Sequence, residues 1–375
     1  MGCQLSASIG EMRVLHLVAA DRWTGAAATA LQLADALRAA GTECTFAYRP
    51  GRNLEVRLRG VEWCLPALAK ERSLGEIRSA VARVRALAAG HDLVHAHLPH
   101  DHLLARQALR GSGTPLVRGV HHLGHLRPDP FHRWLFRGTA AVALSNSAMV
   151  PRCRALAAIA AAPAHVLPVA LEARFRPGGG RDEVRARLGI PPDAVAAGTI
   201  GKLDRSRGHD IFLHALAGAP GVWGIVIGKG PHAEALAKLA RSLGVAGRVA
   251  FPGYVEAGLE DLYAAMDMFV FPAAGSDHAH RAIAEAAGCA VPALAADLPG
   301  VRDLVEPGRT GEVYPGGDAA ALAVLIAAWG RDPARRRSAG AAAAERARNL
   351  WTPERLAAEA LELYRRVIPG HRPQR

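Results

Sequence analysis

The chain has 375 residues, of which half are apolar and 5% aromatic, enough to build two domains with ordinary hydrophobic cores. Its formal net charge is +12, and most of the excess lies in residues 1–177, which carry 22 Lys and Arg against 12 Asp and Glu. No uninterrupted apolar run approaches the ~18–20 residues of a membrane-spanning helix. No basic segment is interleaved with aromatic residues in the manner of a nucleic-acid binder. Integral membrane proteins and nucleic-acid-binding proteins are therefore disfavoured.

The basic first half has two interpretations. It is suited to an anionic membrane surface or an anionic acceptor, or it consists only of arginines on solvated helix faces. The five cysteines are odd in number, widely spaced and without a C-x-x-C pair, which argues against disulfides and structural zinc. We therefore expect a cytoplasmic protein, with peripheral attachment to the inner face of the cell membrane as the further option.

The first strand and helix form a nucleotide-type start. Arg13–Ala19 is a continuous apolar run, Asp21–Gly25 a loop, and Ala26–Ala40 a helix. Because the loop holds a single glycine, Gly25, instead of G-x-G-x-x-G, a dinucleotide-dependent oxidoreductase is disfavoured.

Short apolar runs separated by helical segments continue this pattern through the first half. They predict strands at Glu43–Tyr48, Asp92–Ala96, Pro115–Val120, Ala140–Leu144 and His165–Val169. Four histidines crowd around the end of the second of these runs: His95, His97, His100 and His102. Strand-end histidines without an acidic partner motif are more often polar loop residues than ligands, so no metal site is predicted.

The second half repeats the pattern after a glycine-rich linker, Pro177–Gly180. Strands are predicted at Val195–Ile200, Val222–Ile227 and Val249–Val255. A basic loop with Lys202 and Arg207 follows the first, and a glycine loop with Gly228 and Gly230 follows the second. We expect domains at residues 1–177 and 178–350.

A strand–loop–helix–strand unit occupies residues 267–300. Met268–Phe271 is a buried strand, Asp277–Ala287 a helix ended by Gly288, and Val291–Leu294 a second strand. Such units bind ligands at the carboxyl ends of their strands, where helix N-termini attract anions. Asp277 and Glu285 are eight residues apart near this helix start, although Asp277 is also a favoured N-cap residue.

The spacing of Asp277 and Glu285 resembles the E-x7-E signature of family 4 glycosyltransferases, with Asp in place of the first Glu. The resemblance extends over roughly Arg13 to Ile368 in the family's order of elements. It implies an α/β protein with the GT-B fold, two Rossmann-like domains whose parallel sheets face a central cleft. The first would bind the acceptor and the second the nucleotide-sugar donor, with a last helix at about residues 353–368 packed back on the first domain.

The resemblance also assigns residues. His121 would meet the sugar or acceptor, Lys202 and Arg207 the donor diphosphate, and Asp277 the donor sugar, and these four are the candidate catalytic residues. The expected donor-binding residues are Gly25, Lys202, Arg207, Gly228, Gly230, Tyr254, Asp277, His278, Ala279, His280 and Glu285, the last through the ribose hydroxyls. The histidines at 278 and 280 replace the family's glycines.

These assignments predict retaining transfer of a sugar from a nucleotide-sugar donor, UDP- or GDP-linked, to a hydroxyl of a cell-envelope glycolipid, a polysaccharide or a small molecule. No cofactor and no metal are expected, because two cations and a helix N-terminus can stabilise the leaving diphosphate. The alternative is a non-catalytic nucleotide-sugar or glycan-binding protein with the same fold and an eroded site.

Overall fold

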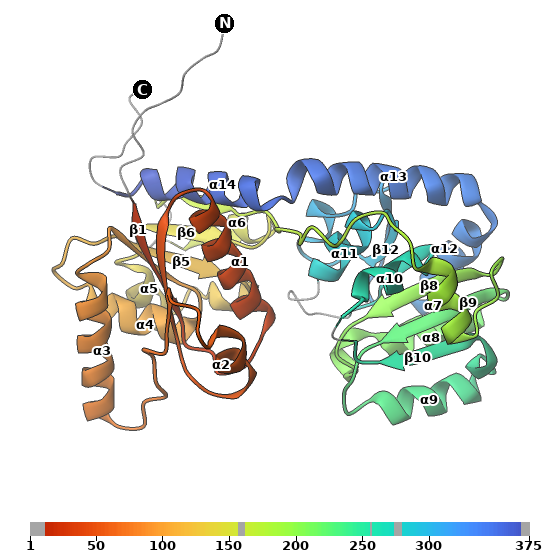
Figure 1. Ribbon diagram of the computed structural model, residues 1–375, viewed down its shortest axis with the longest axis horizontal. Coiled ribbons are helices and arrows are strands. Elements are labelled where there is room, and N and C mark those ends of the chain that lie inside the picture. The colour runs from red at the N-terminus through yellow and green to blue at the C-terminus, as the bar shows by residue number, and fades with distance from the viewer. Residues whose placement is uncertain (1–11, 157–161, 256, 274–279, 369–375) are drawn as a thin grey trace, which may run out of the picture. The chain divides into compact units, whose positions relative to one another are not determined.

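The computed structural model describes residues 12–156, 162–255, 257–273 and 280–368, and it divides the chain into two compact units (Figure 1). One unit contains Met1–Ala170 with Pro353–Arg375, and the other contains Leu171–Thr352. By contacts, the first division falls at Ala170, seven residues before the linker chosen from composition. Asp277, His278 and Ala279 lie outside the described residues.

The first unit is built on a seven-stranded parallel sheet with the order β3-β2-β1-β4-β5-β6-β7. Its strands are β1 (Arg13–Val18), β2 (Glu43–Tyr48), β3 (Cys64–Leu65), β4 (Leu93–Ala96), β5 (Leu116–Val120), β6 (Ala141–Leu144) and β7 (Ala164–Val166). Its helices are α1 (Gly25–Ala39), α2 (Arg52–Leu58), α3 (Leu74–Ala88), α4 (Pro99–Ala108), α5 (Pro130–Phe136), α6 (Met149–Ala155) and α14 (Pro353–Arg365).

Helices cover both faces of this sheet, as a parallel sheet requires. One core joins β1 and β2 to α1 and α14, and a second joins the opposite face of these strands to α3 and α4 (Figure 1). Polar contacts as well as packing hold α14, the last of the described helices, against the sheet of the first unit. His165 Nε2 lies 2.6 Å from a carboxylate oxygen of Glu359, and the Tyr364 hydroxyl lies 2.7 Å from His95 Nδ1.

The second unit has a six-stranded parallel sheet with the order β10-β9-β8-β11-β12-β13. Its strands are β8 (Val195–Ile200), β9 (Val222–Ile227), β10 (Val249–Gly253), β11 (Met268–Phe271), β12 (Ala293–Ala296) and β13 (Gly311–Tyr314). Its helices are α7 (Arg181–Leu188), α8 (His209–Ala217), α9 (Ala233–Ser242), α10 (Leu259–Ala264), α11 (His280–Gly288), α12 (Ala319–Arg331) and α13 (Pro333–Leu350).

The end of α11 differs from the sequence expectation. The left-handed residue that terminates the helix is Ala290 (φ 60°), and the Val291 amide donates to the Ala286 carbonyl. Gly288 serves packing instead, because a Cβ there would lie 2.7 Å from the Phe175 carbonyl oxygen. Because the Val291 amide takes part in the helix cap, β12 begins at Ala293, two residues later than predicted.

Both sheets reverse their strand order once, between β1 and β4 and between β8 and β11. Adjacent connections leave in opposite directions at such a point, and the crevice between them is where open parallel sheets bind ligands. The fold class predicted from the sequence, two Rossmann-like α/β units with parallel sheets, is confirmed.

Candidate functional site

The loop after β8 carries the two predicted cations. The Lys202 ammonium lies 3.2 Å from Asp204 Oδ2, and its side chain is 64% exposed. Asp204 also accepts hydrogen bonds from the amide and hydroxyl of Ser206, which shape the short 3-10 turn that contains Arg207. These contacts, led by the Ser206 hydroxyl, lower the pKa of Asp204. The acid therefore stays charged and holds the loop.

Arg207 is half-buried, and its Nε is a buried donor with no hydrogen-bond partner among the described residues. Leaving such a donor unpaired costs about 1–3 kcal/mol, and more when the group is charged. Arg207 therefore has a charged donor in the loop after β8 that the described residues leave unsatisfied.

Three loops meet around these cations, and glycines allow the approach. A Cβ on Gly228, where φ is 144°, would lie 1.8 Å from the Gly201 carbonyl oxygen. A Cβ on Gly208 would lie 2.0 Å from the Pro272 carbonyl oxygen, and one on Gly230 would lie 2.2 Å from that of Leu203. The loops after β8, β9 and β11 therefore touch through their backbones, at the carboxyl ends of the strands where the sheet reverses its order.

A third cation, Lys229, belongs to the same group of loops. Its carbonyl accepts a hydrogen bond from the Leu203 amide, and its ammonium lies 4.1 Å from the ring centre of Tyr254. Tyr254 is 54% exposed. The sequence named the flanking Gly228 and Gly230, and also Tyr254, as donor-binding residues, but Lys229 was assigned no role. The signal was its position between two glycines directly after a strand.

His209 is the first residue of α8, and its ring contacts the backbone of the basic loop. Its ring is 2% exposed, and Nε2 lies 3.2 Å from the Lys202 carbonyl oxygen. Burial lowers the pKa of this imidazole, so it packs as a neutral group. The imidazole therefore fixes the backbone from which Lys202 projects without adding a charge to the site.

Glu285 is 7% exposed on α11, and protein groups already bind its carboxylate. It accepts hydrogen bonds from Arg281 Nε at 2.7 Å and from the Tyr263 hydroxyl at 3.0 Å. Arg281 in turn contacts Glu172 at 2.6 Å. Burial raises the pKa of Glu285, and Arg281 opposes that rise. Among the described residues, the hydrogen-bond partners of the Glu285 carboxylate thus lie on α10 and α11, and not on the loop that carries Lys202 and Arg207.

Two of the remaining predicted residues, Gly25 and His121, belong to the first unit, and His280 belongs to the second. Gly25 is the first residue of α1, behind an N-cap in which the Thr24 hydroxyl accepts from the Ala27 amide. His121 follows β5 at its carboxyl end, half-buried, with its ring stacked on that of His97. His280 opens α11.

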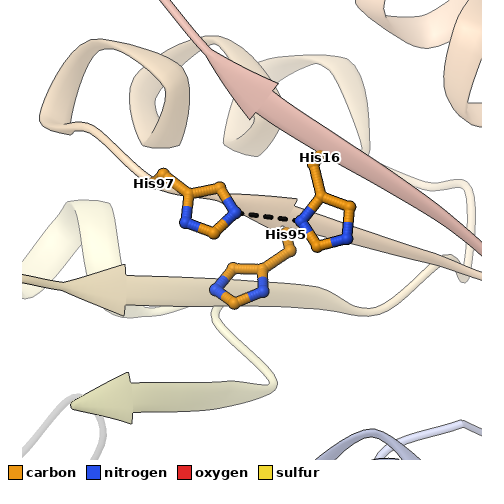
Figure 2. A group of neighbouring side chains, drawn as sticks. All are labelled: His16, His95 and His97. Carbon is orange, nitrogen blue, oxygen red and sulfur yellow. Dashed lines mark hydrogen bonds between the residues drawn. The ribbon is translucent and has the colours of Figure 1, made fainter. Parts of the chain in front are cut away.

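The four histidines that crowd together in the sequence separate in space. His100 Nε2 lies 2.7 Å from a carboxylate oxygen of Glu71, and His102 Nε2 lies 2.8 Å from the Thr139 hydroxyl. His95 and His97 instead lie beside His16 of β1, which the sequence did not connect with them (Figure 2).

Comparisons with known proteins match both units. Residues 23–168 match the family described as Glycosyltransferase Family 4, and residues 180–346 match Glycosyl transferases group 1. A D-inositol 3-phosphate glycosyltransferase of Catenulispora acidiphila is 30% identical over 338 residues, which cover 81% of this chain and 78% of that protein. The chain belongs to the family 4 glycosyltransferases.

Other proteins match over different lengths. A D-inositol 3-phosphate glycosyltransferase of Streptomyces bingchenggensis is 32% identical over 219 residues, 53% of this chain, and the chain spans 46% of that protein. The fold agrees with the structure of Anabaena Alr3699/HepE in complex with UDP, at a TM-score of 0.81 and 22% identity, covering 94% of this chain and 99% of that one. Family membership and glycosyltransferase activity, both predicted from the sequence, are confirmed.

Proposed function

We propose that this glycosyltransferase transfers a sugar from a nucleotide-sugar donor to an acceptor hydroxyl and retains the anomeric configuration. The observation that carries the proposal is the meeting of the loops after β8, β9 and β11, which gathers Lys202, Arg207 and Lys229 at the strand-order reversal of the second unit. The structures of Anabaena HepE are complexes with UDP, with UDP and glucose, and with UDP-glucose. We therefore favour a UDP-sugar as the donor.

The chemistry requires cations where the leaving group develops charge. As the glycosidic bond breaks, the bonding electron pair moves to the diphosphate oxygen, and Lys202 and Arg207 stabilise the added negative charge. The buried Arg207 Nε, which has no partner within the described ranges, would donate to this oxygen. When the donor binds, the Lys202 ammonium would leave the Asp204 carboxylate and contact the phosphate instead. No metal is needed for this step, since the protein supplies fixed positive charge.

For retention, we propose attack on the face from which the diphosphate departs. The acceptor hydroxyl forms the new bond to the anomeric carbon and passes its proton to the departing phosphate oxygen. His121 would hold the acceptor by a hydrogen bond, and no side chain is proposed as a covalent nucleophile. Glu285 would reach the ribose hydroxyls only if it shares its carboxylate with Arg281 and Tyr263.

A donor screen tests this proposal. Purified protein is incubated with UDP-, GDP- and ADP-sugars, and release of the nucleoside diphosphate is measured with and without candidate acceptors. Lys202→Ala should lower the release rate by on the order of 10²–10³. Lys238→Ala is the matched control, because Lys238 forms an exposed i,i+4 pair with Glu234 on α9. Binding of a donor without turnover would instead support the alternative of a non-catalytic binding protein.

We further propose that the acceptor side of the enzyme meets an anionic surface through α5. Phe131 and Trp134 project from this helix with exposed fractions of 53% and 36%, and their rings lie 5.9 Å apart. Arg106 stacks over Trp134 at 4.7 Å, and its pKa is lowered by burial first and then by repulsion from Arg110 and Arg137. We call these five residues, with Arg133, the α5 patch.

Charge balance favours a bilayer with anionic lipids as the partner of the α5 patch. Residues 102–171 contain eight arginines and a single carboxylate, Asp129. That carboxylate is already 2.7 Å from His132 Nδ1. Exposed aromatic side chains among unneutralised arginines suit the headgroup region of a membrane, where each cation near the surface adds ~1 kcal/mol of attraction. No helix among the described residues has the length and apolarity of a membrane span.

Sedimentation with vesicles tests the α5 patch. We expect binding to phosphatidylglycerol-containing vesicles at low salt, loss of binding at high salt, and little binding to phosphatidylcholine vesicles. Trp134→Ala with Arg137→Glu should weaken binding, whereas Arg205→Glu in the second unit should lower it only slightly. Equal sedimentation of the wild type with neutral and anionic vesicles would contradict an electrostatic patch.

A further inference from the structure

Three buried imidazoles lie together at the strand-order reversal of the first unit (Figure 2). His16 of β1 and His95 of β4 are paired in register, and His97 follows β4 directly. Their exposed fractions are 0%, 1% and 1%. The ring centres of His95 and His97 are 4.1 Å apart, and those of His16 and His97 are 5.3 Å apart. The cluster lies on the sheet face covered by α14, whose Tyr364 contacts His95.

The three rings do not satisfy one another. His16 Nδ1 and His97 Nε2 are 3.0 Å apart and share one hydrogen bond, and His95 Nδ1 is 2.7 Å from the Tyr364 hydroxyl. The other ring nitrogens, His16 Nε2, His95 Nε2 and His97 Nδ1, are buried and have no hydrogen-bond partner among the described residues. Each unpaired polar atom costs about 1–3 kcal/mol in a protein interior. Three in one cluster indicate a ligand that the imidazoles would bind.

The chemistry of the cluster suits a transition-metal ion. Burial lowers the pKa of His16 to about 3 and the pKa values of His95 and His97 well below 6.5, so all three rings are neutral. A neutral imidazole has one lone pair, so a metal ion bound by all three rings would replace the hydrogen bond that His16 and His97 share. One ligand nitrogen from each ring lies within 4.8 Å of the others. Imidazole nitrogens favour Zn²⁺, Cu²⁺ and Ni²⁺, whereas Mg²⁺ and Ca²⁺ prefer oxygen ligands.

The surroundings of the cluster fit such a site. A histidine ligand normally donates its second ring N–H to an oxygen, which fixes the tautomer, and the Tyr364 hydroxyl is placed to accept from His95 Nδ1. Gly119 of β5 keeps the space beside the rings open, because a Cβ there would lie 3.0 Å from His95 Nε2 and 3.3 Å from His97 Nδ1. Side-chain rotations that bring the nitrogens closer by up to roughly 1.5 Å would reach the spacing of ligands on one Zn²⁺.

We propose that His16, His95 and His97 form a three-histidine site for a divalent transition-metal ion of the Zn²⁺ type, held in the first unit. The site differs from the proposed donor site, whose cations belong to the second unit, and its failure would leave the transfer chemistry untouched. It also revises the sequence expectation that the chain holds no metal ligands. The ion would join the carboxyl ends of β1 and β4 beneath α14.

Cobalt binding tests the site in the full-length, tag-free protein. After removal of metals with a chelator, the protein is titrated with Co²⁺, which absorbs strongly in the visible range when its coordination is tetrahedral. The expected result is such a spectrum, saturating at about one ion per chain and abolished by stoichiometric Zn²⁺. His97→Gln should weaken Co²⁺ binding at least tenfold. His214→Gln, which removes an exposed histidine on α8, should bind as the wild type does.

Each outcome of this experiment is decisive. A wild type that shows only weak, octahedral Co²⁺ absorption would overturn the proposal whatever the variants do. Equal binding by His97→Gln and the wild type would overturn it as well, since surface histidines would then hold the ion. If His97→Gln fails to fold, His16→Gln and the wild-type spectrum give the same test.

Discussion

Arg281 lies one helical turn before Glu285 on α11 and donates a 2.7 Å hydrogen bond from Nε to the Glu285 carboxylate. The Tyr263 hydroxyl donates to the same carboxylate from α10, and Arg281 continues to Glu172. Glu285, expected to bind only a ribose, therefore also ties α10 to α11. A donor that uses Glu285 has to compete with these partners or share the carboxylate with them.

A double-mutant cycle measures this pair. Arg281→Leu, Glu285→Gln and the double variant are compared by urea unfolding. Because the Glu285 side chain is only 10% exposed, we expect a coupling free energy of roughly 1–3 kcal/mol. The control is the pair Glu234–Lys238, which has the same spacing on α9 but exposed fractions of 80% and 66%. Its coupling should stay near ~0.5 kcal/mol or below, and equal couplings would show that burial of Glu285 contributes nothing.

Arg205 and Arg207 lie in the same short 3-10 turn but differ in burial. In the part of the chain that the structure describes, the buried Nε of Arg207 has no hydrogen-bond partner, whereas Arg205 is exposed. Arg207→Ala should lower kcat for donor cleavage by on the order of 10²–10³, because a charge-assisted contact to the departing diphosphate is lost. Arg205→Ala should retain most of the activity. Steady-state kinetics with the best donor from the screen decide the matter, and similar losses in both variants would mean that only general positive charge is required.

The fold was largely predictable because parallel strands are continuous apolar runs. Glu43–Tyr48, Val195–Ile200 and Val222–Ile227 were predicted with the bounds that the structure has. Short or half-buried elements were not predicted: β3 has two residues, and α5 exposes Phe131 and Trp134, so neither has a clear periodic pattern.

Site residues on loops beside predicted strands were easier to find than contacts made across the fold. Lys202 and Arg207 follow a strand in the sequence, so their place at the sheet edge could be inferred. The joining of His16 to His95 depends on the pairing of β1 with β4, which are 79 positions apart and adjacent only because the strand order reverses there. The Arg281–Glu285 contact did have a signal, the four-residue spacing of opposite charges on a predicted helix.

Gly228 provides a test of the loop arrangement. Its Cβ would overlap the Gly201 carbonyl oxygen, and its φ of 144° is unfavourable for other residues. Gly228→Ala should therefore push apart the loops after β8 and β9, lowering donor affinity at least tenfold and reducing the unfolding free energy by several kcal/mol. Gly221→Ala is the control, because Gly221 also has a positive φ, 86°, but open space around the added methyl group. That variant should lose only ~1 kcal/mol and keep its donor affinity, as measured by calorimetry.

The buried imidazole of His209 predicts a pH dependence of stability. Its pKa is lowered from 6.5 by burial, so below pH 6.5 the unfolded chain binds a proton that the folded protein does not. The contribution of the neutral imidazole to the free energy of unfolding is therefore fully present above pH 6.5. It is lost as the pH falls toward the lowered pKa, by up to about 1.4 kcal/mol per pH unit for one proton. His209→Gln should be less stable at pH 7.5 but should lose less stability between pH 6.5 and 5. Urea midpoints at a series of pH values measure both effects, with His214→Gln, an exposed histidine of the same helix, as the control. A wild-type slope unchanged in His209→Gln would show that this imidazole is protonated in the folded state as readily as in the unfolded chain.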